Sequence, residues 1–193
     1  MTFRLSNNRI RSFIAVDLED ATIKERIVKL QMDLQKTAAD LKLVEPNIMH
    51  LTLRFIGEIP ELTVEKVKEI MRSAHFSEFQ ASFKGVGAFP NLNRINVIWI
   101  GITEGQDHLN GIFHQIEPNL RQIGLAPDNK GFSPHLTIAR VKSGRNIETL
   151  ASVVTKSSDL EFGSMAVKCV RLKKSTLTPK GPIYSTLHEM QAT

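Results

Sequence analysis

The sequence predicts an α+β fold made of two related lobes that face each other. β-prone and helical segments follow one another in the order β-α-β-α-β-β-α-β-α-β-β. The tetrapeptide His-Leu-Thr-aliphatic occurs at 50–53 and again at 135–138, and each copy has a helical segment before it and after it. No linker or low-complexity segment separates the halves, so we expect residues 1–193 to form one bilobal domain.

The first half of the chain alternates between strands and helices. Asp20 can cap a helix, because apolar residues recur at helical spacing after it. Pro46 interrupts the chain before the first tetrapeptide, and Pro60 can open the following helix. We therefore expect strands at 10–18, 49–56 and 79–89, and helices from residue 20 to about 41 and from residue 60 onward.

The second half repeats this alternation and ends in strands. The turn at 91–93 precedes a strongly β-prone run, and Gly124 can end the helix that follows it. A second turn at 179–182 separates the last two apolar runs. We expect strands at 95–102, 134–141, 162–177 and 183–190, and helices at 106–123 and 147–155.

The two tetrapeptides indicate a phosphate site with two histidines. Chance placement gives only about 0.07 such copies in a chain of this composition. Residues two apart in a strand point to the same face, so His50 shares a face with Thr52, and His135 shares one with Thr137. Two imidazoles can supply a general acid and a general base near neutral pH, while hydroxyls hold phosphate oxygens.

Two arginines near the tetrapeptides are candidate substrate contacts. Arg54 is in phase with His50 and Thr52, so simple alternation directs it to the same face. Arg140 is out of phase with His135, so alternation directs it away unless the strand bulges or ends.

Other features of the composition narrow the class of protein. The net charge of +5 weakly favours a polyanionic partner. The single cysteine, Cys169, is incompatible with an intrachain disulfide framework or a cysteine-based zinc cluster. Neither a long apolar run nor a signal-peptide pattern is present, so we expect no membrane partner and a cytoplasmic location.

The sequence offers no pattern for a metal or a cofactor. Metal-ligand spacings such as HExxH are missing, and the glycines at 85 and 87 lack the context of a dinucleotide loop. Phe89 and Phe132 could stack on bases, whereas Trp99 lies in an apolar run and is expected in the core.

Four segments in this order resemble the 2H phosphoesterase superfamily, and in particular its RNA 2′,3′-cyclic phosphodiesterases, formerly called 2′-5′ RNA ligases. These segments are RSFIAVDL, HLTLRFIGEI, FSPHLTIARV and STLTPKGPIY. The resemblance implies antiparallel sheets lining a central cleft, with helices on the outer faces. It also implies metal-free hydrolysis of a terminal RNA 2′,3′-cyclic phosphate to a 2′-phosphate.

The resemblance also implies a role for each residue of the tetrapeptides. His50 would protonate the leaving 3′ oxygen, His135 would accept a proton from water, and Thr52 and Thr137 would hold the phosphate. RNA with a cyclic phosphate end is then the partner, with tRNA halves and small cyclic nucleotides as candidates, and no obligate protein partner is evident. Two alternatives stay open: ATP-independent 2′-5′ RNA ligation, and a non-catalytic module that binds RNA ends.

Overall fold

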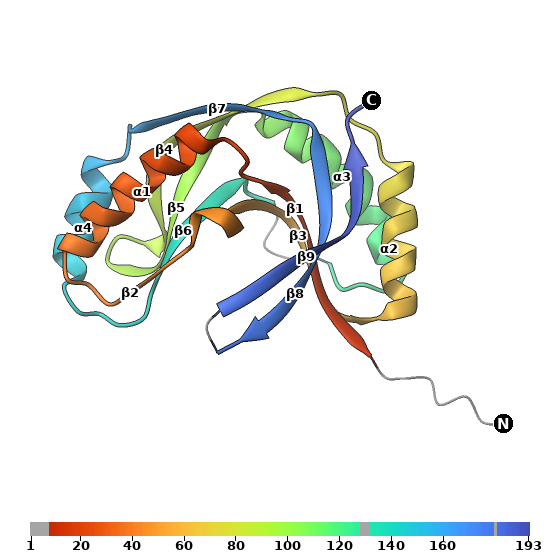
Figure 1. Ribbon diagram of the computed structural model, residues 1–193, viewed down its shortest axis with the longest axis horizontal. Helices are drawn as coiled ribbons and strands as arrows, with labels where there is room; N and C mark the ends of the chain where they lie inside the picture. The colour runs from red at the N-terminus through yellow and green to blue at the C-terminus, as the bar shows by residue number, and fades with distance from the viewer. Residues whose placement is uncertain (1–7, 128–131, 180) are drawn as a thin grey trace.

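The computed structural model describes residues 8–127, 132–179 and 181–193 (Figure 1). Within this part of the chain, nine strands, four α-helices and one short 3₁₀ helix form. The strands are β1 (Arg9–Asp17), β2 (Leu41–Leu43), β3 (His50–Pro60), β4 (Phe79–Asn91), β5 (Arg94–Glu104), β6 (His135–Val141), β7 (Glu161–Val167), β8 (Cys169–Thr178) and β9 (Gly181–Gln191). The helices are α1 (Ala21–Lys36), η1 (Pro46–Ile48), α2 (Glu61–Ser73), α3 (Gln106–Gln122) and α4 (Ile147–Lys156).

The strands form one antiparallel sheet with a nearly symmetric order. The order is β7-β4-β5-β6-β3-β1-β8-β9, and β2 pairs with β6 beside this path. The two motif strands, β3 and β6, meet in the middle through the pair Leu51–Leu136. Three strands then follow outward on each side. The α+β fold class is confirmed, and the two expected sheets are joined into one.

The helices form two pairs that flank the sheet at opposite ends of the molecule. α1 lies beside α4, and α2 lies beside α3 (Figure 1). The Asp20 side chain caps α1 as predicted, because it accepts a hydrogen bond from the amide of Ile23 at 2.8 Å. One pair therefore belongs to each half of the sheet.

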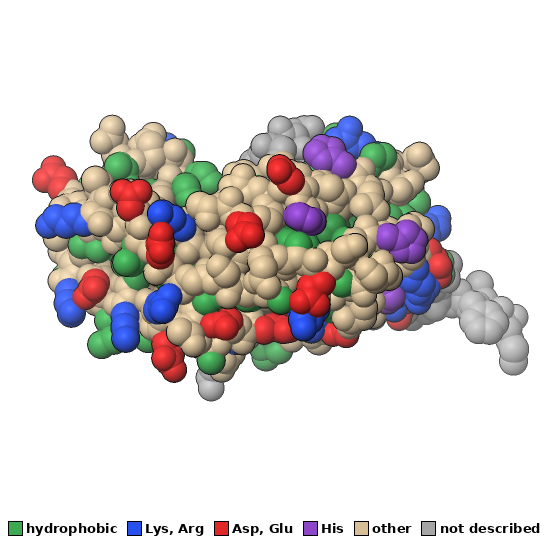
Figure 2. All heavy atoms as spheres, turned by 90° about the horizontal axis from the view of Figure 1, so that it is seen from above, with side chains coloured by type: hydrophobic (Ala, Val, Ile, Leu, Met, Phe, Trp, Pro, Cys, Tyr) green, Lys and Arg blue, Asp and Glu red, His purple; other side chains and the backbone are tan. Residues whose placement is uncertain are grey.

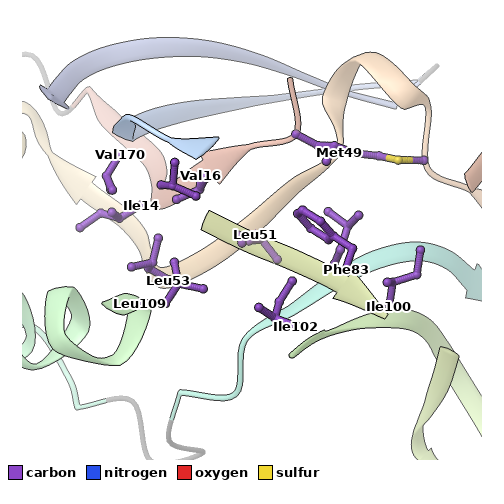
Figure 3. Packing of buried hydrophobic residues seen from close by; sticks show 14 of the residues in the cluster. Ile14, Val16, Met49, Leu51, Leu53, Phe83, Ile100, Ile102, Leu109 and Val170 are labelled. Carbon is purple, nitrogen blue, oxygen red and sulfur yellow. The ribbon is translucent and has the colours of Figure 1, made fainter. Parts of the chain in front are cut away.

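A single cluster of buried apolar side chains lies beneath the two motif strands. Leu51, Leu53, Leu136 and Ile138 are all at most 2% exposed, as strand alternation requires. Figure 3 shows Leu51 and Leu53 packed among side chains from β1, β4, β5 and α3. Because this cluster runs through both halves, we propose that residues 1–193 work as one bilobal domain.

Two predicted boundaries were wrong. The first helix ends at Lys36 and not near residue 41, because Ala38 adopts a left-handed conformation with φ of 55°. The next residues form β2 on the edge of β6. The strand predicted at 162–177 is divided at Lys168, since β7 pairs with β4 in one half while β8 pairs with β1 and β9 in the other.

The distribution of charged side chains and the length of the apolar helices can be compared with the composition. On the face shown in Figure 2, basic and acidic side chains are interspersed. Among the described residues, no helix is long and apolar enough to cross a membrane. The cytoplasmic location stays a prediction.

The central strand pair should be the most sensitive point of the fold. We expect Leu136→Ala to lower the free energy of unfolding by about 2–5 kcal/mol, because it leaves a cavity under the β3–β6 junction. The matched control is Leu62→Ala on the exposed side of α2, with a change within about 0.5 kcal/mol. Urea unfolding followed by circular dichroism measures both. Equal losses for the two variants would contradict a core at this junction.

Candidate active site

The four polar residues of the tetrapeptides lie on one face of the sheet, opposite the buried leucines. We call this the open face. His50, Thr52, His135 and Thr137 are all partly exposed, while the paired Leu51 and Leu136 are buried. In an antiparallel pair, one step from Leu51–Leu136 places each histidine across from the threonine of the other strand. The two histidines are then diagonal neighbours, a relation that typically separates positions by about 7–8 Å.

Each histidine is held by a backbone carbonyl two residues before it. His50 Nδ1 lies 2.8 Å from the carbonyl oxygen of Ile48, and His135 Nδ1 lies 2.7 Å from that of Ser133. A carbonyl can only accept, so Nδ1 carries a proton and donates in both rings. Nε2 is therefore the nitrogen that can gain or lose a proton in each histidine.

Burial and nearby charges act on His50. Burial lowers the pKa of His50, and the positive charges of Lys173 and Arg140 lower it further. The contact with Ile48 and the negative charge of Asp17 oppose this shift. The net shift of the pKa is downward, so the surroundings of His50 favour its neutral imidazole in the free protein.

Aromatic side chains surround His50. The ring centroid of Phe13 lies 4.7 Å from that of His50, and Tyr184 packs edge-on at 5.3 Å. Phe13 and Tyr184 also contact each other, at 5.0 Å. Phe13 and Asp17 were missed in the sequence, although their position in the strand that pairs with the first motif could have indicated them.

A second aromatic group lies beside His135. Phe89 packs edge-on against His135 at 5.1 Å, and the Trp99 ring lies 6.4 Å from it. The prediction that Trp99 lies in the core was wrong: it is half-buried beside His135. Gly87, its partner on β4, provides the space, because a Cβ there would lie 2.2 Å from the Trp99 ring.

A β-bulge in each motif strand changes the direction of the two arginines. In β3, Thr52 and Arg54 pair with adjacent residues of β1, and Leu53 between them has no partner there. In β6, Ile138 has the same position relative to β5. An extra residue reverses the alternation of everything after it. Both bulges fall three residues after the motif histidine.

The first bulge turns Arg54 away from the open face, so the direction predicted by simple alternation was wrong. Arg54 is 7% exposed, and its Nε lies 2.6 Å from the Glu117 carboxylate on α3. Its guanidinium also donates to the backbone carbonyls of Phe55 and Ala126. The structure therefore does not bring Arg54 together with the four motif residues.

The second bulge has the opposite effect on Arg140. Arg140 is exposed, and its positive charge adds to the lowering of the His50 pKa and opposes the rise that burial causes in the pKa of Tyr184. The sequence predicted that Arg140 would reach the motif face only if the strand bulged or ended, and the bulge in β6 meets this condition.

Within the described part of the chain, no group of three or more His, Cys, Asp or Glu side chains could hold a metal ion.

The family model for LigT-like phosphoesterases matches this chain twice, over residues 16–99 and 100–184. The chain belongs to the LigT-like phosphoesterase family. Each match contains one motif histidine, His50 in the first and His135 in the second. The resemblance to 2H phosphoesterases is thereby confirmed.

Several relatives of this family are similar over nearly their whole length. A protein of Archaeoglobus fulgidus named RNA 2′,3′-cyclic phosphodiesterase is 40% identical over 178 residues, covering 92% of this chain and 98% of its own. A protein of Aeropyrum pernix with the same name is 38% identical over 167 residues, covering 86% and 95%.

Two solved structures have a similar fold. The crystal structure of Escherichia coli LigT complexed with 3′-AMP has a TM-score of 0.80 at 22% identity, and covers 96% of this chain and 99% of that one. A Thermus thermophilus structure, that of TT0787, has a TM-score of 0.78 at 24% identity, covering 94% and 97%.

The position of Arg140 can be tested through His50. We expect a pKa for His50 below its ordinary value of 6.5 and, in Arg140→Met, a rise toward that value, because a nearby positive charge is removed. NMR titration of the ring protons measures both, with the signal assigned by its loss in His50→Gln. Arg121→Met on α3 removes the same charge elsewhere and should leave the pKa unchanged. An unmoved His50 in Arg140→Met would contradict the placement of Arg140.

Proposed function

We propose that this protein hydrolyses RNA 2′,3′-cyclic phosphate ends to 2′-phosphomonoesters by acid and base catalysis with two histidines and without a metal. The observation that carries this proposal is the diagonal pair of histidines on the open face, each with Nδ1 held by the main chain. The names of the two archaeal relatives support the same substrate.

The geometry suits an in-line displacement at phosphorus. A phosphate between His50 and His135 would have one Nε2 near the attacking water and the other near the leaving oxygen. Because Nδ1 of each ring donates to a backbone carbonyl, Nε2 is the ring nitrogen left to exchange a proton with the water or the leaving oxygen. The threonine across from each histidine can then donate a neutral hydrogen bond to a non-bridging oxygen.

We assign the acid to His50 and the base to His135, as the family resemblance implies. The lowered pKa of His50 in the free protein opposes this assignment, since an acid must carry a proton. A bound phosphodiester supplies a negative charge next to the ring and removes water from it, and the charge favours the protonated form. His50 would therefore gain its proton together with the substrate.

Other side chains of the open face fit a nucleotide. Arg140 is a cation near His50 and can hold a phosphate oxygen. The aromatic groups beside the two histidines offer faces and edges to bases or riboses. We propose Thr52, Thr137 and Arg140 as substrate contacts, and no longer Arg54, whose side chain is engaged with α3.

The decisive assay uses a short RNA that ends in a 2′,3′-cyclic phosphate. We expect a 2′-phosphate product, and a rate lower by about 10²–10⁴ in His50→Ala and in His135→Ala, because each loses one proton transfer. The double variant should lose less than the product of the single losses. Activity should persist in excess EDTA.

The same assay separates the alternatives. With a second RNA carrying a 5′-hydroxyl, a 2′-5′ joined product at dilute RNA would favour ligation, which the same acid and base could catalyse. Binding without turnover in the intact protein would favour the non-catalytic module. Cleavage to a 3′-phosphate would contradict the proposed assignment of the leaving oxygen.

The roles of the two histidines have a separate test. The rate of the intact enzyme should follow a bell-shaped dependence on pH, because one ring must be neutral and the other protonated. A substrate with a much better leaving group at the 3′ position should partly restore His50→Ala and leave His135→Ala unchanged. Restoration of His135→Ala instead would exchange the two roles.

A further inference from the structure

Arg54 connects the first motif strand to the helix that precedes the second motif strand. Its Nε lies 2.6 Å from Glu117 Oε2 on α3, and both side chains are less than a tenth exposed. The same carboxylate accepts a second bond from Arg121, 2.9 Å from Oε1. A buried ion pair of this kind is costly to break, because the carboxylate stays buried with one charged contact fewer. The position of α3 relative to β3 therefore depends on Arg54.

Between α3 and β6, the segments described before and after residues 128–131 both contact this group of side chains. Residues 128–131 themselves lie outside the described part. On one side, the carbonyl of Ala126 accepts a hydrogen bond from the Arg54 guanidinium. On the other side, the Phe132 ring stacks on Phe113 of α3, with centroids 5.3 Å apart and planes at 17°. Phe113 and Glu117 are four residues apart and share a face of α3.

The residue next to Phe132 in the sequence contacts His135 directly. Ser133 follows Phe132 directly, and its carbonyl holds Nδ1 of His135 at 2.7 Å. We propose that Arg54 is a positioning residue for His135: it fixes α3, on which Phe132 stacks, and thereby the Ser133 carbonyl that orients the imidazole. The effect on catalysis rests on the proposed function, in which His135 exchanges a proton with water.

His50 is anchored in a different way, which makes the proposal specific. The position in β6 that corresponds to Arg54 holds Ala139, which is fully buried and has no charge. The carbonyl that holds His50 belongs to η1, where the amide of Ile48 bonds to Glu45, and the neighbouring Met49 carbonyl bonds to Leu18. A change at Arg54 should therefore act on His135 and not on His50.

The test compares three variants. Arg54→Met breaks the ion pair and the bond to Ala126. Arg54→Met with Glu117→Met removes both charges and keeps apolar volume, an exchange that commonly preserves stability. Arg121→Met is the matched control, because it removes the other arginine on Glu117 without touching β3 or Ala126. The readouts are kcat and KM on the cyclic phosphate, ¹⁵N NMR of the histidine rings, and urea unfolding.

We expect Arg54→Met to lower kcat by about 10–100-fold with little change in KM, because small displacements of a reacting group have effects of this size. The Nδ1 signal of His135 should show a mixture of tautomers, while that of His50 stays unchanged. The double variant should recover stability and not kcat. Arg121→Met should keep kcat within about twofold.

Two results would overturn the proposal. The first is recovery of both stability and kcat in the double variant, which would make the pair a stabilising contact alone. The second is an unchanged His135 ring signal in folded Arg54→Met. If the intact protein did not act on cyclic phosphates, the proposed function would fail on its own, and the ring signals would still decide whether Arg54 positions His135.

Discussion

The pairing of Leu51 with Leu136 is the constraint on which the rest of the molecule depends. It joins the two halves of the sheet, and it sets the register of both motif strands in one contact. A shift of one residue would bury two histidines and two threonines and expose the leucines, since side chains alternate along a strand. The hydrophobic core thereby fixes the geometry of the open face. The strands next to the motif strands then bring an aromatic group to each histidine.

Local patterns of the sequence were sufficient for most of the fold. Alternation and helical spacing located nearly every element, and Asp20 caps α1 as its position suggested. The errors arose where long-range pairing decides the local structure. The end of α1 depends on Ala38 with a positive φ and on the pairing of β2 with β6. The division at Lys168 exists because the neighbouring strands lie in different halves of the sheet.

The directions of Arg54 and Arg140 could not be predicted for a related reason. A bulge does not alter the order of residue types, so the sequence shows no sign of it. The two bulges occupy equivalent positions. Because of them Arg140 lies on the open face and Arg54 does not, the reverse of what simple alternation predicts. Trp99 is a similar case, because only the register with Gly87 explains why a large ring lies beside His135. The two halves thus share a backbone arrangement but place different side chains at equivalent positions.

The main-chain anchors of the two imidazoles bear on how this site tolerates mutation. In many enzymes a carboxylate orients the histidine, and one substitution removes it. Here the acceptors are the carbonyls of Ile48 and Ser133, which every amino acid would supply. The side chains at these two positions are thereby free to drift during evolution without loss of the hydrogen bond. Within this lineage, variability at residues 48 and 133 would be compatible with a fully retained active site.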